Sequence, residues 1–123
     1  MSETGQNFIA GAWCDGQSPI ANINPSDLSD QIGHFAQADS AQLDRALEAA
    51  QNAQKKWAVT GLEARQTILM NIGNELMERR IELGNLLSRE EGKPLAEGVG
   101  EIYRAGQFFT YYAAEVLRQI GDT

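Results

Sequence analysis

A change of hydrophobic periodicity near Asp39 divides this chain into two parts. Before Asp39, short apolar runs alternate with Gly, Pro, Asn, Asp and Ser, which is typical of strands joined by turns. After it, apolar residues recur every three or four positions, as on one face of a helix. We therefore expect an α+β fold, with two short β-hairpins in residues 1–38 followed by four mostly antiparallel helices in residues 39–123.

Four extended runs are expected in the first part. Phe8–Ala10 and Ala12–Cys14, separated by Gly11, are predicted to form a short hairpin closed at Asp15-Gly16. A second run covers Ile20–Ile23 and ends at Asn24-Pro25-Ser26-Asp27, a strong turn signal because each of these residue types favours turn conformations. Residues Gln31–Ala36 are predicted to return as another strand.

Local signals mark the ends of several helices in the second part. The first predicted helix carries apolar residues from Leu43 to Trp57. Thr60-Gly61-Leu62-Glu63 has the pattern of a capping box, in which the threonine hydroxyl and the glutamate satisfy early backbone amides of the next helix. Gly92 is suited to end a third helix in the left-handed conformation, and Pro94 is suited to begin the fourth.

Composition excludes several classes of function. The chain has 17 acidic and 10 basic residues and a formal net charge of −7, so the basic footprint of a nucleic-acid-binding protein is missing. No apolar run reaches the length needed to cross a bilayer. The single cysteine, Cys14, cannot form an internal disulfide, and no signal-peptide pattern is seen. We expect a cytoplasmic protein with no nucleic-acid or membrane partner.

No self-sufficient active site can be built from these residues. Cys14 would need a base, and the only histidine, His34, lies in a different predicted strand. A second histidine to complete a metal site with His34 is missing. The last helix carries an aromatic cluster of Phe108, Phe109, Tyr111 and Tyr112, preceded by Arg104. The cluster could be a core or subunit contact or could line a tunnel, and Arg104 could pair with Glu101, face solvent or meet a substrate.

Several segments taken in order resemble the N-terminal part of the NAD(P)-dependent aldehyde dehydrogenase superfamily. Asn7–Trp13 resembles its opening hairpin, which typically reads F-I-N-G-E-W, and Asn22–Asp27 resembles its N-P turn. Arg65–Arg80 is similar to an R-x-x-x-L helix of the family. Glu90–Pro94 matches E-x-G-K-P, and Tyr111–Ala114 is similar to the Y-Y-A helix that follows. The segment from Glu90 to Arg118 most resembles the subgroup that acts on 2-oxoglutarate semialdehyde.

The resemblance implies an α/β enzyme with a Rossmann-like cofactor domain, of which residues 39–123 would be the helical front. The family's catalytic cysteine, general-base glutamate, oxyanion asparagine and cofactor-binding glycine turn all follow later than Thr123. No catalytic or cofactor-binding residue is therefore assigned here. NAD or NADP is expected in the complete enzyme, no cofactor is expected on this fragment, and the isolated chain is expected to be inactive.

Two supporting roles are implied by the resemblance. Backbone carbonyls at Asn22 and Ile23 and the side chain of Glu90 match positions that hold a monovalent cation in the family. Arg104 and Phe108 lie on the helix that borders the substrate tunnel, where Arg104 could meet the distal carboxylate of a semialdehyde. Expected partners are the remainder of the enzyme, further copies of the chain in a homo-oligomer and a small aldehyde. The alternative is a stand-alone, non-catalytic helical module for oligomerisation or interaction.

Overall fold

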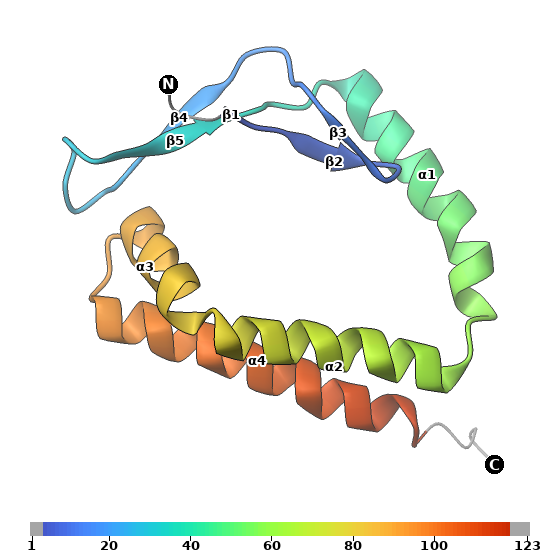
Figure 1. Cartoon of the computed structure of the whole chain (residues 1–123). Helices are drawn as coiled ribbons and strands as arrows, with labels where there is room; N and C mark the ends of the chain where they lie inside the picture. The colour runs from blue at the N-terminus through green and yellow to red at the C-terminus, as the bar shows by residue number, and fades with distance from the viewer. Residues whose placement is uncertain (1–3, 119–123) are drawn as a thin grey trace. The chain divides into compact units, whose positions relative to one another are not determined.

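The computed structural model describes residues 4–118, which fold as two compact units divided between Val59 and Thr60 (Figure 1). The first unit contains the strands and one helix, and the second contains three helices. This confirms the expected α+β class, with strands preceding helices. The change from strands to helices lies between Phe35 and Ser40, while the division between compact units comes one helix later.

The first unit contains a three-stranded sheet in the order β1-β5-β4. Strands β4 (Ile20–Ile23) and β5 (Gln31–Phe35) pair antiparallel, as expected for the second hairpin, and a register shift interrupts the ladder between Asn22 and Ile23. Strand β1 (Thr4–Gly5) pairs parallel to β5. The sequence analysis missed β1, because two residues are too short to show a period.

The other hairpin joins β2 (Asn7–Ile9) to β3 (Ala12–Cys14). Its reversal lies at Ala10 and Gly11, both of which have positive φ angles of 54° and 82°. Positive φ at both central residues is typical of the tight turns that match strand twist. This confirms the predicted hairpin, with one arm before Gly11 and the other over Ala12–Cys14. Asp15-Gly16 follows the second strand and is not the turn that joins the two.

Helix α1 (Ser40–Ala58) begins at Asp39, whose side chain accepts a hydrogen bond from the Gln42 amide at 2.7 Å. This is the ordinary chemistry of an N-cap, which satisfies a donor that the first helical turn leaves open. The buried Gln42 then ties α1 to the hairpin. Its amide nitrogen donates to the Asp15 carbonyl at 2.5 Å, and its oxygen accepts from the Asn7 side chain at 3.0 Å.

The second unit consists of α2 (Leu62–Glu78), α3 (Arg80–Glu91) and α4 (Leu95–Val116). Helix α4 packs along α2 in the antiparallel direction and also contacts α3 (Figure 1). The N-cap of α2 is Gly61 rather than the predicted Thr60, so the cap residue has no side chain with which to cap the helix. The helix therefore begins one residue later than the capping-box pattern predicted.

Small residues form the contact between these helices. An added Cβ on Gly73 of α2 would lie 2.9 Å from the Gly106 carbonyl of α4, and one on Gly106 would lie 2.8 Å from the Gly73 carbonyl. A second close approach brings Gly98 of α4 against Gly84 of α3. An added Cβ on Gly98 would lie 2.5 Å from the Gly84 carbonyl. The buried positions of the unit are accordingly small: Gly73, Gly84, Ser88, Gly98, Gly106 and Ala113.

Arg79 forms two ion pairs at the junction between α2 and α3. Its guanidinium pairs with Glu75 at 2.9 Å and with Glu82 at 2.8 Å. The hydrogen bonds to Glu82 and then Glu75 raise the pKa of Arg79, and the hydrogen bond from Arg79 lowers the pKa of Glu82.

Gly92 ends α3 with φ of 68°, as predicted, and Pro94 is the cap residue of α4. Of the helices within residues 4–118, none is long and apolar enough to span a membrane.

Candidate functional site

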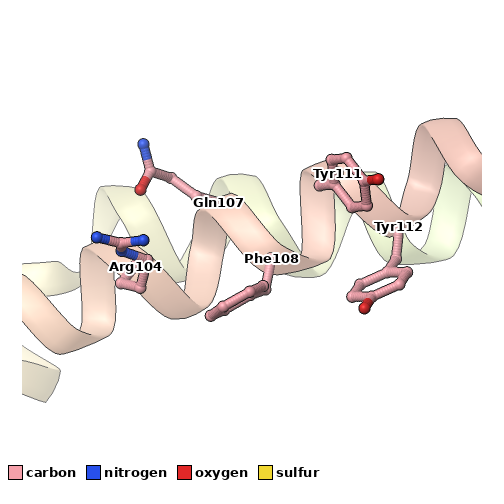
Figure 2. A pocket seen from close by; sticks show the side chains of 5 residues that line it. All are labelled: Arg104, Gln107, Phe108, Tyr111 and Tyr112. Atoms are coloured by element: carbon pink, nitrogen blue, oxygen red, sulfur yellow. The ribbon is translucent and has the colours of Figure 1, made fainter.

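The outer side of α4 carries a shallow hollow of about 330 Å³. Figure 2 shows the side chains that line it, all from this one helix, with Phe108 and Tyr112 extending to the same side. Residues three, four, seven and eight positions apart fall on one side of a helix, which explains why the sequence brings them together. The lining residues are Arg104, Gln107, Phe108, Tyr111 and Tyr112.

The hollow is apolar along most of its length and cationic at one end. Tyr111 and Tyr112 meet edge to face with ring centroids 5.2 Å apart, a geometry favoured by the charge distribution of aromatic rings. The guanidinium of Arg104 lies at the other end. Arg104 and Phe108 lie on one side of the helix, as their spacing predicted, while Phe109 does not line the hollow and is half-buried. Gln107 was missed, although its spacing of three from Arg104 was a usable signal.

The side chain of Arg104 makes no hydrogen bond or ion pair with another residue of the described range 4–118. The pairing with Glu101 that the sequence left open is not formed. Glu101 instead accepts a hydrogen bond from the Lys93 ammonium at 2.6 Å. A guanidinium is permanently charged and presents a rigid fork of donors that fits a carboxylate. The hollow is therefore suited to bind a short chain that ends in a carboxylate.

The side chains that line the hollow are of types suited to binding a ligand, without a typical nucleophile and base. Its lining side chains provide a cation, an amide, two phenols and a phenyl ring, with neither a thiol nor an imidazole among them. Within residues 4–118, no group of three His, Cys, Asp or Glu side chains is arranged to hold a metal ion.

Cys14 has a local contact rather than a catalytic setting. It is half-buried at the end of β3, and its Sγ lies 3.7 Å from the Ala12 carbonyl oxygen. The ring of His34, on β5, lies 3.3 Å from the Gln31 amide nitrogen. A nucleophilic cysteine needs an adjacent base or another feature that favours the thiolate. The contact of Cys14 is with a backbone carbonyl oxygen, which is not a base that would favour the thiolate.

The residues predicted to hold a monovalent cation belong to different units of the structure. Asn22 and Ile23 flank the register shift in β4. Glu90 is exposed in the last turn of α3. The structure describes each part by itself, and the joint cation site stays a prediction.

A second hollow, of about 250 Å³, lies between the β2–β3 hairpin and α1 in the first unit. The sequence analysis did not anticipate it. Its lining is wholly apolar and includes a row of alanines on α1, which leave space because they carry only a methyl group. The lining residues are Phe8, Ile9, Ala10, Ala46, Ala49, Ala50 and Ala53. No charged or polar side chain marks this hollow for a particular ligand.

Comparison with known proteins identifies the family to which this fold belongs. Residues 13–123 match the family model described as the aldehyde dehydrogenase family. The chain belongs to the aldehyde dehydrogenase family, which confirms the resemblance carried by its motifs.

Curated relatives include several enzymes named for semialdehydes. The chain is 36% identical over 120 residues to the succinate-semialdehyde dehydrogenase [NADP(+)] GabD of Escherichia coli (strain K12), covering 96% of this chain and 25% of that enzyme. It is 35% identical over 120 residues to the alpha-ketoglutaric semialdehyde dehydrogenase of Bacillus subtilis (strain 168), covering 94% and 24%. The chain thus spans about a quarter of the length of these relatives.

Solved structures show the same likeness. The aldehyde dehydrogenase from Brucella melitensis biovar abortus 2308 superposes with a TM-score of 0.91 at 30% identity, over 97% of this chain and 25% of that chain. An NADP-dependent enzyme from E. coli superposes with a TM-score of 0.90 at 35% identity, over 98% and 25%. The arrangement of strands and helices described above is therefore the one found in this part of full-length enzymes.

Proposed function

We propose that this chain is the N-terminal part of an NAD(P)-dependent aldehyde dehydrogenase that oxidises a semialdehyde bearing a carboxylate, such as 2-oxoglutarate semialdehyde. Membership of the family supports the reaction class. The names of the relatives support the substrate class, since they include succinate-, alpha-ketoglutaric and glutarate-semialdehyde dehydrogenases.

The observation that carries the substrate class is the arrangement of charge in the α4 hollow. An aldehyde with a distal carboxylate needs an apolar wall for its methylene chain and a cation for its anionic end. Phe108 and Tyr112 supply the wall, and Arg104, which has no ion-pair partner within residues 4–118, supplies the cation. Binding a carboxylate would therefore not require breaking an existing ion pair.

In the complete enzyme, this chain would supply specificity and the rest of the protein would supply chemistry. By the family resemblance, a cysteine beyond Thr123 would attack the aldehyde carbon as a thiolate, while NAD or NADP would accept the hydride. The role proposed for Arg104 and Phe108 is to hold the far end of the substrate. Within the complete enzyme, this chain is expected to pack against the remainder of the fold. The complete enzyme is expected to form a homo-oligomer.

The test compares two substrates in the complete enzyme and in its Arg104→Leu variant. Loss of a charge-assisted contact of about 1.5–3 kcal/mol should lower kcat/KM for a semialdehyde acid by about tenfold to a hundredfold. An uncharged aldehyde of similar length should be oxidised nearly as well as by wild type. Arg104→Lys is the matched control, because it keeps the charge but loses the planar fork, and it should recover part of the preference.

Two results would argue against this function. Equal loss for both substrates would show that Arg104 supports the fold rather than the carboxylate. An intact mass of the native protein corresponding to these 123 residues alone, with no aldehyde oxidation, would favour the alternative of a helical interaction module.

A further inference from the structure

Lys93, at the junction between α3 and α4, is held more firmly than a surface lysine usually is. Only 15% of its side chain is exposed, and its ammonium contacts both Glu91 and, at 2.6 Å, Glu101. The hydrogen bonds to Glu101 and then Glu91 raise the pKa of Lys93, so it remains cationic at neutral pH.

The backbone at Lys93 is anchored as well. The buried Ser88 donates its hydroxyl to the Lys93 carbonyl at 2.5 Å, and the Lys93 amide donates to the Ser88 carbonyl at 3.1 Å. The left-handed Gly92 directs the chain into this position. Backbone and side chain together fix the ammonium beside the first turns of α4.

The residue that Lys93 holds is the acid best placed to neutralise Arg104. Residues three or four apart on a helix can pair, and the neighbours of Arg104 at these spacings are Gly100, Glu101, Gln107 and Phe108. Glu101 alone among them is acidic. A Glu three residues before an Arg is an ordinary helix-surface pair, yet here the carboxylate is engaged by Lys93 instead.

We propose that Lys93 is a positioning residue for substrate recognition: by holding Glu101, it keeps Arg104 unpaired and available to the substrate carboxylate. This inference rests on the function proposed above. It makes carboxylate preference depend on a lysine that does not line the hollow, and it predicts an intramolecular competitor, Glu101, when that lysine is lost.

The experiment is a mutant cycle in the complete enzyme with Lys93→Met, Glu101→Gln and the double variant. Release of Glu101 onto Arg104 should raise KM for the semialdehyde acid by up to about twofold in Lys93→Met, with kcat little changed, as expected for lost uniform binding. The uncharged aldehyde should be unaffected. The double variant should recover the wild-type KM, because no acid remains to compete, and Lys93→Arg should retain it.

A second variant tests the competition without disturbing Lys93. An added Cβ at Gly100 would meet no atom within 4 Å, so Gly100→Glu can be accommodated and places an acid four residues before Arg104. It should raise KM for the semialdehyde acid as Lys93→Met does, while Gly100→Gln, its neutral counterpart, should not. These two variants decide the matter if Lys93→Met fails to fold.

The outcomes separate this inference from the function on which it rests. If Arg104→Leu has no selective effect, the carboxylate function itself fails. If Arg104→Leu is selective but Glu101→Gln does not rescue Lys93→Met, or Gly100→Glu behaves like Gly100→Gln, the competition is absent and Lys93 is only a structural link.

Discussion

Ala10 occupies a conformation that costs an alanine energy. Its φ of 54° lies in the left-handed region, where the Cβ of an L-residue comes too close to the following carbonyl oxygen. Asparagine tolerates this conformation better, because its short side chain can form local hydrogen bonds. The opening hairpin that this chain resembles typically has asparagine at the position of Ala10.

We therefore expect Ala10→Asn to stabilise the protein. Relief of part of a strain of about 1–2 kcal/mol should raise the free energy of unfolding by about 0.5–1 kcal/mol. Thermal or denaturant unfolding would measure the change. Ala12→Asn is the matched control, since Ala12 is exposed on β3 and has no positive φ. An equal gain at both positions would show that strain at Ala10 is not the cause.

At this scale, spacing predicted part of the candidate site and missed the rest. Arg104 and Phe108 are four residues apart on one helix, so their shared side follows from helical geometry alone. The contact between Lys93 and Glu101 spans eight residues and the turn between two helices. It depends on how the chain turns at Gly92, which no periodicity specifies. The sequence suggested a Glu101–Arg104 pair because only the local partner is visible in it.

The three-helix unit is organised by the crossings of α4 over α2 and α3. At both crossings, glycines let the backbones approach more closely than any side chain would allow. Glycine within a helix normally costs up to about 1 kcal/mol relative to alanine. Here the close packing of the helices offsets that cost, because the two backbones can come into contact only where neither residue carries a Cβ.

Alanine substitution should distinguish the packed glycines from the open one. A Cβ at Gly73 would lie 2.7 Å from the Thr110 Cγ2 and 2.9 Å from the Gly106 carbonyl. Gly73→Ala should therefore destabilise the protein by about 1–3 kcal/mol through overpacking. Gly100→Ala, at a position with open space, should be neutral or stabilising by up to about 1 kcal/mol. Denaturant midpoints would measure both, and equal effects would contradict the packing role of Gly73.

Elements with a clear period could be predicted, and elements defined by pairing could not. All four helices follow from apolar spacing, and Gly92 marked the end of α3 because its conformation suits glycine. Strand β1 exists through its pairing with β5, so nothing in Thr4-Gly5 itself indicates a strand. The start of α2 was misplaced because a capping-box pattern states which residues can cap, while packing decides where the helix begins.

The whole chain exposes more large apolar surface than an independent domain usually does. Exposed side chains on α1 include Leu43, Leu47 and Trp57, and those on α4 include Tyr103 and Phe108. Among residues 4–118, Ala113 is the one buried apolar side chain apart from glycines. Extended exposed apolar surface generally marks contact with another part of a protein or with another copy.

We expect this chain, when prepared alone, to self-associate and to show no aldehyde oxidation. Association would cover the apolar side chains that the relatives' remaining three quarters of length would otherwise contact. Sedimentation velocity over a range of concentrations, together with an NAD and NADP assay, would measure both properties. A compact monomer at high concentration would contradict the first expectation. Turnover that disappears in Cys14→Ser would contradict the second.

The two glycine crossings also matter for protein engineering. Rotation of α4 about its own axis would drive a side chain into α2 or α3. The glycines at the crossings therefore fix which side of α4 faces outward, and the residues on that outer side do not. Positions 104, 107, 108, 111 and 112 all face away from those crossings. They can be randomised together as a library for new substrates, while Gly73, Gly84, Gly98 and Gly106 are kept constant to hold the register.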